Sequence, residues 1–221
     1  MSKARAFLMS FALCALPALG GCSGLKWLVY VFTPEQPDPV VEAEYAGLEG
    51  RSVAIVVYAD AGTLFEYPRA RLEVASAIAN EMRANVKNVR VVDPQRVIRW
   101  QNENLDWDNT DRTKMGQLFG ANYVLYVALA RFTTREPGSE YLFRGDIQAD
   151  IFLYQTSLDE RRSRVWAAND VRVQYPPTTA VPADNDNLVR LATISVMADY
   201  VAKKFYKHKV PRQQEPTGTG T

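Results

Sequence analysis

The chain has 221 residues, 47% of them hydrophobic, which is enough for one sizeable core, and its 26 basic and 25 acidic residues almost cancel. Binding to nucleic acid needs a local excess of Lys and Arg, but the basic residues cluster only from Lys203 to Arg212, where cations complement the negative pole of a helix. We therefore expect no nucleic-acid partner. One histidine, His208, and two cysteines, Cys14 and Cys22, leave Ser-His-Asp, Cys-His and ordinary zinc sites without their required groups.

The first 22 residues predict an export signal that ends at a cysteine. Two basic residues precede the apolar run 7–16, which is too short to span a bilayer as a permanent helix. Gly20 and Gly21 then leave an unhindered backbone for a peptidase. An ordinary secretory signal and an amino-terminal anchor helix are the alternatives.

Leu19-Gly20-Gly21-Cys22 resembles the lipobox of bacterial lipoproteins. In that family the cysteine thiol is acylated and the preceding peptide is removed. The resemblance implies a signal peptide at 1–21 and a lipidated Cys22 that carries fatty acyl chains such as palmitate. Ser23 implies sorting to the outer membrane, facing the periplasm, because Asp at that position is the inner-membrane retention signal of such lipoproteins. Cleavage would remove two of the 26 basic residues and no acid, for a formal charge of −1 and no free thiol.

Residues 22–44 are predicted to be the lipidated anchor and a spacer. The apolar segment 25–32 fits either the headgroup layer, which Trp and Tyr favour, or packing on the domain. Pro34, Pro37 and Pro39 stiffen the following stretch, which would hold the domain off the membrane.

The domain itself is expected at 45–209 and begins with the β-branched run 52–58, typical of a strand covered on both faces. Pro68 opens a helix to about Asn85, and a second strand at 89–92 would complete a βαβ unit. The expected buried positions of this helix are Leu72, Ala75, Ala79 and Met82. Residues 60–63 have one glycine and no following Gly-Lys-Ser/Thr, so we interpret them as a plain loop rather than a phosphate-binding loop.

An acidic run, Asp106, Asp108 and Asp111, precedes a short helix that Gly120 can end in a left-handed conformation. Oxygen ligands at alternate positions are typical of calcium loops, but no glycine follows at the sharp turn and Gln117 replaces the bidentate Glu. We favour an amino-terminal cap, in which Asp108, Asn109 or Thr110 accepts a hydrogen bond from a helix N–H and Asp111 favours the positive pole of the helix. Residues 184–187 have the same interpretation.

Three strands follow, an interior one at 123–129 and two that alternate. The predicted core-facing side chains are Phe143, Gly145, Ile147, Ala149, Ile151 and Leu153 in the first alternating strand, with Val165, Ala167, Val171 and Val173 in the second. Arg144, Asp146, Gln148 and Asp150 lie on the opposite face. The pattern predicts an antiparallel hairpin with one wetter face.

A final helix is predicted from about Asp186 to His208, where His208 would be exposed at the frayed end. Its core-facing stripe is expected to comprise Leu188, Leu191, Ser195, Ala198, Val201 and Phe205, widened by Ile194 and Met197. The tail 210–221 has too little apolar surface to fold.

We therefore expect an α/β (α+β) fold in a single domain, with a mixed sheet of about five strands, a βαβ start, an antiparallel meander and a long carboxy-terminal helix. This order, with the Gly-Ala-Asn-Tyr-Val-Leu passage at 120–125, resembles the α/β domain shared by three envelope proteins. They are the curli-secretion lipoprotein, the lipoprotein activator of penicillin-binding proteins and the amino-terminal domain of the Tol-Pal propeller protein. The resemblance implies a noncatalytic periplasmic part of an envelope complex. A pore is not expected, because the pair of long amphipathic hairpins that forms the secretion barrel is missing.

The leading hypothesis is a lipid-anchored periplasmic binding or assembly module with no catalytic, metal or cofactor residues and with an envelope protein as partner. One alternative is an envelope hydrolase that uses paired carboxylates, and another is the auxiliary lipoprotein of a lipid transporter, which would need an apolar groove. Five aromatic residues could form a sugar or peptide surface, although core packing is the more common role: Trp100, Trp107, Tyr141, Phe143 and Trp166.

Overall fold

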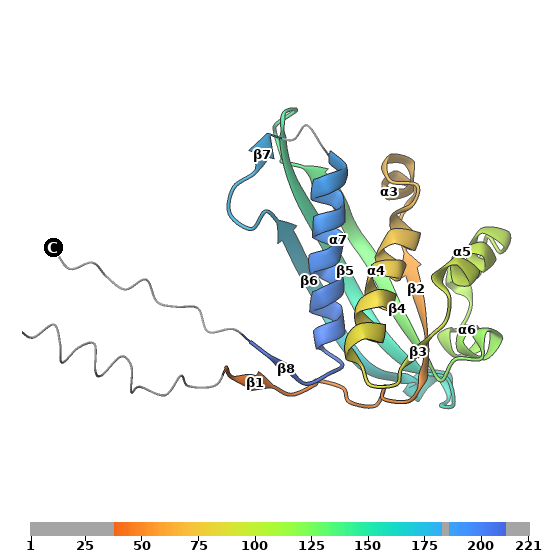
Figure 1. The fold of residues 1–221 in the computed structure, drawn as a ribbon. Coiled ribbons are helices and arrows are strands. Elements are labelled where there is room, and N and C mark those ends of the chain that lie inside the picture. Colours follow the sequence, from red (N-terminus) through yellow and green to blue (C-terminus); the bar gives the residue numbers. More distant parts are fainter. Residues whose placement is uncertain (1–37, 183–185, 211–221) are drawn as a thin grey trace, which may run out of the picture. The chain divides into compact units, whose positions relative to one another are not determined.

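The computed structural model describes residues 38–182 and 186–210. The predictions for the signal peptide, Cys22, the apolar segment 25–32 and the tail beyond residue 210 fall outside these residues. Within them, no helix combines the length and the apolarity needed to cross a bilayer. Residues 40–209 form one compact unit (Figure 1).

The predicted βαβ start is confirmed. β2 (Ser52–Tyr58) is followed by α4 (Ala70–Asn85) and β3 (Arg90–Val91), and β2 and β3 pair in parallel. The buried face of α4 repeats at helical spacing through Val74, Ile78 and Met82, whereas the predicted Leu72 is only half-buried.

Two helices were not predicted. α3 (Ala61–Glu66) occupies the expected plain loop, and its cap is Asp60, which accepts a hydrogen bond from the Thr63 N–H at 2.6 Å. α5 (Pro94–Glu103) begins after Asp93, which caps it by accepting from the Gln95 N–H at 3.0 Å.

The helix after the acidic run is capped at both ends, at its amino end by a different residue from those predicted. A 3-10 turn, η1 (Trp107–Asn109), leads into α6 (Arg112–Phe119). Asp111 accepts hydrogen bonds from the N–H groups of Thr113 and Lys114, and Gly120 closes the helix with φ 65°. The capping residue is therefore Asp111 and not Asp108, Asn109 or Thr110 as predicted, whereas the predicted left-handed end at Gly120 is confirmed.

The main sheet is mixed, with strand order β3-β2-β4-β5-β6. β4 (Tyr123–Arg135) pairs in parallel with β2 and antiparallel with β5 (Leu142–Gln155), which pairs antiparallel with β6 (Arg164–Tyr175). Short β7 (Val181–Pro182) pairs with β5, which makes six strands, and the turn between β5 and β6 contains η2 (Glu160–Arg162). β1 (Val40–Val41) and β8 (His208–Lys209) form a separate two-stranded sheet.

One face of the main sheet packs against α4 and α7 (Asp186–Lys203), as Figure 1 shows. The contact is close, because Gly145 of β5 has no room for a side chain: a Cβ there would lie 1.8 Å from Oγ1 of Thr193 on α7. An ion pair between Glu73 and Arg190 links α4 to α7 at the border of this layer.

The core stripe of α7 differs from the prediction. Leu188 and Leu191 are 67% and 54% exposed, while the buried series includes Val189, Thr193 and Met197 and continues through Val201 and Phe205. These buried residues recur every four positions, which is more than the 3.6 residues of one helical turn. The buried stripe therefore rotates gradually around the helix as α7 crosses the twisted sheet. The prediction assumed a stripe parallel to the helix axis through Ala198 and Val201, and it therefore selected Leu188 and Leu191 at the amino end although both are exposed.

The other face of the sheet is covered only in part. α5, η1 and α6 pack over β2 and the first half of β4, around Val56, Trp107, Met115 and Val124. The second half of β4 and most of β5 and β6 lie beyond this layer. Helices therefore cover both faces of the sheet at β2 and the first half of β4, but only one face at the second half of β4 and over most of β5 and β6.

The hairpin alternates as predicted for Gly145 through Leu153, but not throughout. Ala167 is exposed and Trp166 packs on the core instead, because the register between β5 and β6 shifts between Ala149 and Ile151. Asp170, in the left-handed region at φ 54°, sits in that bulge. Phe143, half-buried beyond another register shift, also lies outside the cluster packed on α4 and α7.

Candidate functional site: the polar face of β4 to β6

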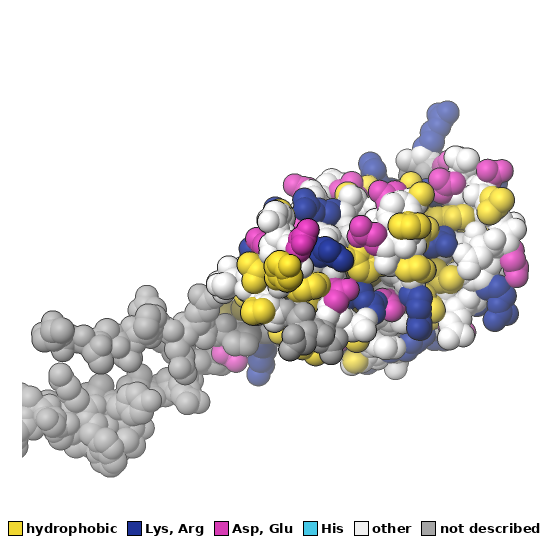
Figure 2. Space-filling model, turned by 90° about the horizontal axis from the view of Figure 1, so that it is seen from above, with side chains coloured by type: hydrophobic (Ala, Val, Ile, Leu, Met, Phe, Trp, Pro, Cys, Tyr) yellow, Lys and Arg dark blue, Asp and Glu magenta, His cyan; other side chains and the backbone are white. Residues whose placement is uncertain are grey.

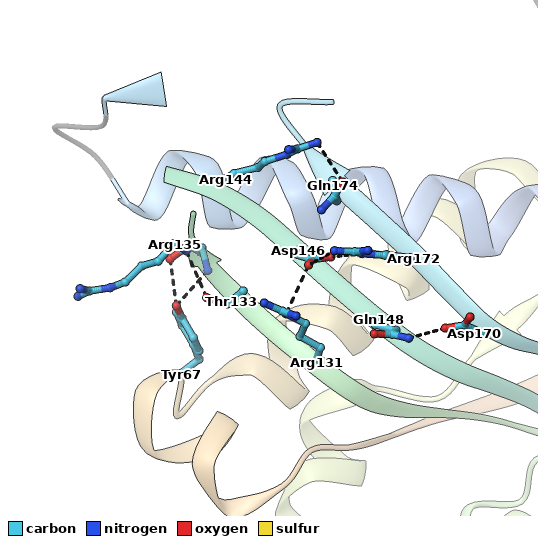
Figure 3. Close-up of polar contacts among 11 residues, drawn as sticks. Tyr67, Arg131, Thr133, Arg135, Arg144, Asp146, Gln148, Asp170, Arg172 and Gln174 are labelled. Atoms are coloured by element: carbon cyan, nitrogen blue, oxygen red, sulfur yellow. Dashed lines mark hydrogen bonds and ion pairs between the residues drawn. The ribbon is translucent and has the colours of Figure 1, made fainter. Parts of the chain in front are cut away.

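The uncovered part of the sheet presents a band of polar side chains, which we call the polar face (Figure 3). Its residues alternate with buried ones: Asp146 and Gln148 flank Ile147 on β5, for example. The polar face comprises Arg131, Thr133 and Arg135 from β4, Arg144, Asp146 and Gln148 from β5, and Asp170, Arg172 and Gln174 from β6.

Asp146 lies at the centre of this band, and its side chain is only 7% exposed. Arg172 donates to both carboxylate oxygens, from Nε to Oδ1 at 2.9 Å and from Nη2 to Oδ2 at 2.7 Å. On the other side, Nε of Arg131 lies 3.4 Å from Oδ2. The hydrogen bonds from Arg172 lower the pKa of Asp146 against the opposing effect of burial, so this carboxylate is ionised at neutral pH.

Arg144 is the third arginine near this centre. Its Nη2 donates to Oε1 of Gln174 at 3.0 Å and to the carbonyl oxygen of Pro177 at 2.8 Å, and both acceptors are neutral. Its Nε is buried and has no hydrogen-bond partner among the described residues. Arg144 is therefore held in place without a carboxylate to balance its charge.

The acidic residues farther along the band have local partners. Gln148 donates to Asp170, and the backbone N–H of Asp170 donates to Oδ1 of Asp150 at 2.8 Å. These contacts hold the bulged backbone of β6.

A register shift aims Arg131 at this face. Residues Val124 and Tyr126 of β4 face α5 and α6, and a strict alternation would place Phe132 on that same side. The shift between Leu129 and Arg131 reverses the alternation, so that Phe132 joins the main core and Arg131 reaches Asp146. The bulge thus places Arg131 beside Asp146, the carboxylate that Arg172 also contacts.

An aromatic zone continues the same side of the sheet toward α6. The guanidinium of Arg164 lies 5.6 Å from the ring centre of Phe152, and that of Arg112 lies 4.2 Å from the ring centre of Tyr126. Beside this zone is a cavity of about 430 Å³, with Asp108 and Asp111 from the predicted acidic run in its lining. Asp111 is occupied with capping, and no three His, Cys, Asp or Glu side chains gather as a metal site in the described part of the chain.

The other residues singled out in the sequence do not come together. Trp100 stacks edge-on against Phe119, Trp166 stacks against Phe205, and Tyr141 is 80% exposed at the β4–β5 turn. His208 is not at a helix end: α7 stops at Lys203, and His208 is half-buried in β8 opposite Val41.

Alternation in β5 did reveal Arg144, Asp146 and Gln148 as one wetter face, but Arg131 and Arg172 were missed. Their proximity to Asp146 depends on strand pairing and on the bulges. Asn169 and Asp170 occupy the bulge in β6, and this pair was an available signal, because Asn and Asp are enriched among the non-glycine residues that adopt positive φ.

Together these features define an α/β domain with a mixed sheet, helices across one face and a half-open polar second face. No protein-family model and no curated protein sequence matches the chain. Among solved structures, it is similar to the PelC dodecamer from Paraburkholderia phytofirmans, with 13% identity and a TM-score of 0.44, covering 77% of this chain and 99% of that one.

Lipoprotein GNA1162 from Neisseria meningitidis is 17% identical with a TM-score of 0.41, covering 69% of this chain and 98% of that one. A minor lipoprotein from Acinetobacter baumannii is 9% identical with a TM-score of 0.32, covering 70% of this chain and 91% of that one. At these values the likenesses assign no role to the chain. The expected relationship to the curli-secretion lipoprotein group stays a prediction.

Proposed function

We propose that this chain is a noncatalytic binding or assembly module of a bacterial envelope complex, anchored by acyl chains on Cys22 at the periplasmic side of the outer membrane. The observation that carries the proposal is the polar face: an uncovered sheet surface on which Arg131 and Arg172 pair with the buried Asp146 and Arg144 is held by Gln174 and Pro177. A pre-ordered polar surface loses less conformational freedom on binding than a mobile one. The lipobox resemblance at 19–22 supports the anchor.

The charge states of the carboxyl groups favour binding over hydrolysis. In the described residues, the pKa is clearly lowered for Glu44, Asp60, Asp111 and Asp146. Burial is the largest single influence on the pKa of Asp111 and raises it, but the hydrogen bonds around Asp111 together outweigh that effect. A carboxylate hydrolase needs a general acid with a raised pKa, which is the opposite direction.

The chemistry of the cavities does not favour a lipid carrier either. A cavity of about 530 Å³ near the start of β4 is lined mainly by polar side chains, among them Arg51, Gln117, Asn122 and Thr156. The cavity of about 430 Å³ beside α6 is lined mainly by charged and polar ones. A lipid-binding groove would present apolar walls.

The anchor is tested by Cys22→Ala in cells. We expect the variant to lose acylation and to leave the membrane fraction, because acyl chains supply about 0.8 kcal/mol per buried CH₂. An unchanged mass and unchanged membrane retention would contradict the anchor.

The binding role is tested by photocrosslinking in intact cells. A photoreactive residue at Gln148 on the polar face should give a discrete crosslinked envelope protein, and one at the exposed Asn80 on α4 should not. Reproducible turnover of an envelope substrate that is lost in Asp146→Asn would overturn the noncatalytic assignment.

A further inference from the structure

We infer that the polar face binds an acidic protein segment, whose carboxylates pair with Arg131, Arg144 and Arg172. The inference rests on the proposed binding function and names the chemistry of the partner. It depends on charge balance, on unused hydrogen-bond donors and on what surrounds the arginines.

The charge balance is positive where the arginines gather. The polar face carries four arginines, Arg131, Arg135, Arg144 and Arg172, and two carboxylates, Asp146 and Asp170, which gives it a formal charge of +2. Two of the arginines share Asp146, and among the described residues neither Arg135 nor Arg144 has an acidic partner. The polar face is complementary to a surface with several negative charges.

The donors left over match carboxylates. Arg131 reaches Asp146 through Nε alone, and its side chain is 45% exposed; the side chain of Arg172 is 53% exposed. A guanidinium fork pairs bidentately with a carboxylate, as Arg172 already does with Asp146. Their remaining N–H groups face solvent and are available for such pairing.

The neighbourhood of these arginines resembles a protein interface more than a membrane-binding patch. Tyr141, 80% exposed, and Tyr175, 38% exposed, lie at the same end of β5 and β6 as Arg144. Tyr and Arg are enriched where interfaces derive most of their binding energy. Strands β4, β5 and β6 contain no lysine.

A bilayer-directed surface would show a dense basic field. Figure 2, which views the domain from above, shows hydrophobic side chains interspersed with basic and acidic ones at that end. A second copy packed through the same face is disfavoured, because two polar faces of formal charge +2 would repel each other.

The test measures binding of fluorescein-labelled poly-L-glutamate to the acylated full chain in a neutral detergent, by fluorescence anisotropy at several salt concentrations. We expect saturable binding that weakens with salt. Replacing Arg131, Arg144 and Arg172 by Gln together should weaken it by about tenfold or more.

A matched control removes the same charge elsewhere. Arg69→Gln, Arg99→Gln and Arg162→Gln change three exposed arginines on other elements. We expect this variant to bind as wild type does. The far-ultraviolet circular dichroism spectrum shows whether the Arg131, Arg144 and Arg172 variant is folded. If its spectrum differs from that of the wild type, the single variant Arg131→Glu is used in its place, and it should also weaken binding.

The proposal is overturned if poly-L-glutamate does not bind, or if both triple variants weaken binding equally. It is also overturned if phosphatidylglycerol vesicles compete as effectively as the polymer, which would identify a phosphate-bearing lipid surface instead. The crosslinking experiment at Gln148 distinguishes the proposed binding function from the proposed acidic partner. If Gln148 crosslinks to an envelope protein but poly-L-glutamate does not bind, the binding function is retained and the acidic partner is rejected.

Discussion

The two faces of the main sheet use the same strands for different purposes. On β5, Ile147 and Ala149 are about 1% exposed under α7, whereas Asp146 and Gln148, which alternate with them, carry a carboxylate and an amide of the polar face. The apolar face stabilises the fold through burial, at roughly 25 cal/mol per Å² of apolar area. Half-exposed ion pairs on the other face contribute little to stability. Alternation therefore places residues that stabilise the fold directly beside residues of the polar face, which we propose to bind a partner.

The difference between the two faces is tested most directly by truncating adjacent residues that lie on opposite faces. Ile147→Ala removes a buried side chain next to α7 and should lower the free energy of unfolding by about 2–5 kcal/mol. Gln148→Ala removes one hydrogen bond with the exposed Asp170 and should cost less than about 1 kcal/mol. Urea unfolding of both variants measures the difference, and similar losses would show that the polar face is also part of the core.

Asp146 is the residue where the two faces are least distinct, because it is polar yet buried. Asp146→Asn should cost about 1–2 kcal/mol, since it weakens charge-assisted hydrogen bonds while Arg131 and Arg172 can turn toward water.

The pH dependence of this loss has a defined sign. The pKa of Asp146 is lowered in the folded state, so its stabilising contribution is complete above the unfolded pKa of about 3.9 and is lost as pH falls through the folded value. The stability difference between wild type and Asp146→Asn should be constant from pH 6 to 8 and shrink below about pH 4. A difference that grows as the pH falls would refute this ion pairing.

The smallest expected change in stability comes from an exposed residue of α7, compared with a buried residue of the same helix. Leu191→Ala should change stability by no more than about 0.5 kcal/mol because Leu191 is 54% exposed, whereas the fully buried Val201→Ala should cost roughly 2 kcal/mol. Thermal unfolding of the pair measures the contrast. A large loss in Leu191→Ala alone would mean that something covers this side of α7 in solution.

Sequence patterns predicted the elements with strong periodicity. The β-branched run 52–58 and the alternation in 145–153 identified β2 and β5, and Gly120 marked the carboxyl end of α6. α3 escaped prediction because none of its six residues is buried, so no apolar period exists to detect. α5 had a start signal in Asp93-Pro94, but only Pro94, Val97 and Gln101 are buried.

The candidate site was predictable only in part, because strand pairing decides it. The side chains of β5 were assigned to the correct face, since alternation is a local property. Arg131 and Arg172 come from strands on either side, and each is positioned by a register shift. Such shifts arise from contacts between strands and have no period along the chain.

The bulge at Asp170 also protects the domain from aggregation. β6 is the last strand in the order β3-β2-β4-β5-β6, so one side of its backbone is open to pairing with a strand from another molecule. A residue at φ 54° in the middle of that strand bends the edge, and charged Asp170 and Arg172 accompany the bend. A flat intermolecular β-ribbon cannot extend past such an interruption. The bulge that positions Arg172 beside Asp146 thus also interrupts the open edge along which neighbouring copies could join their sheets.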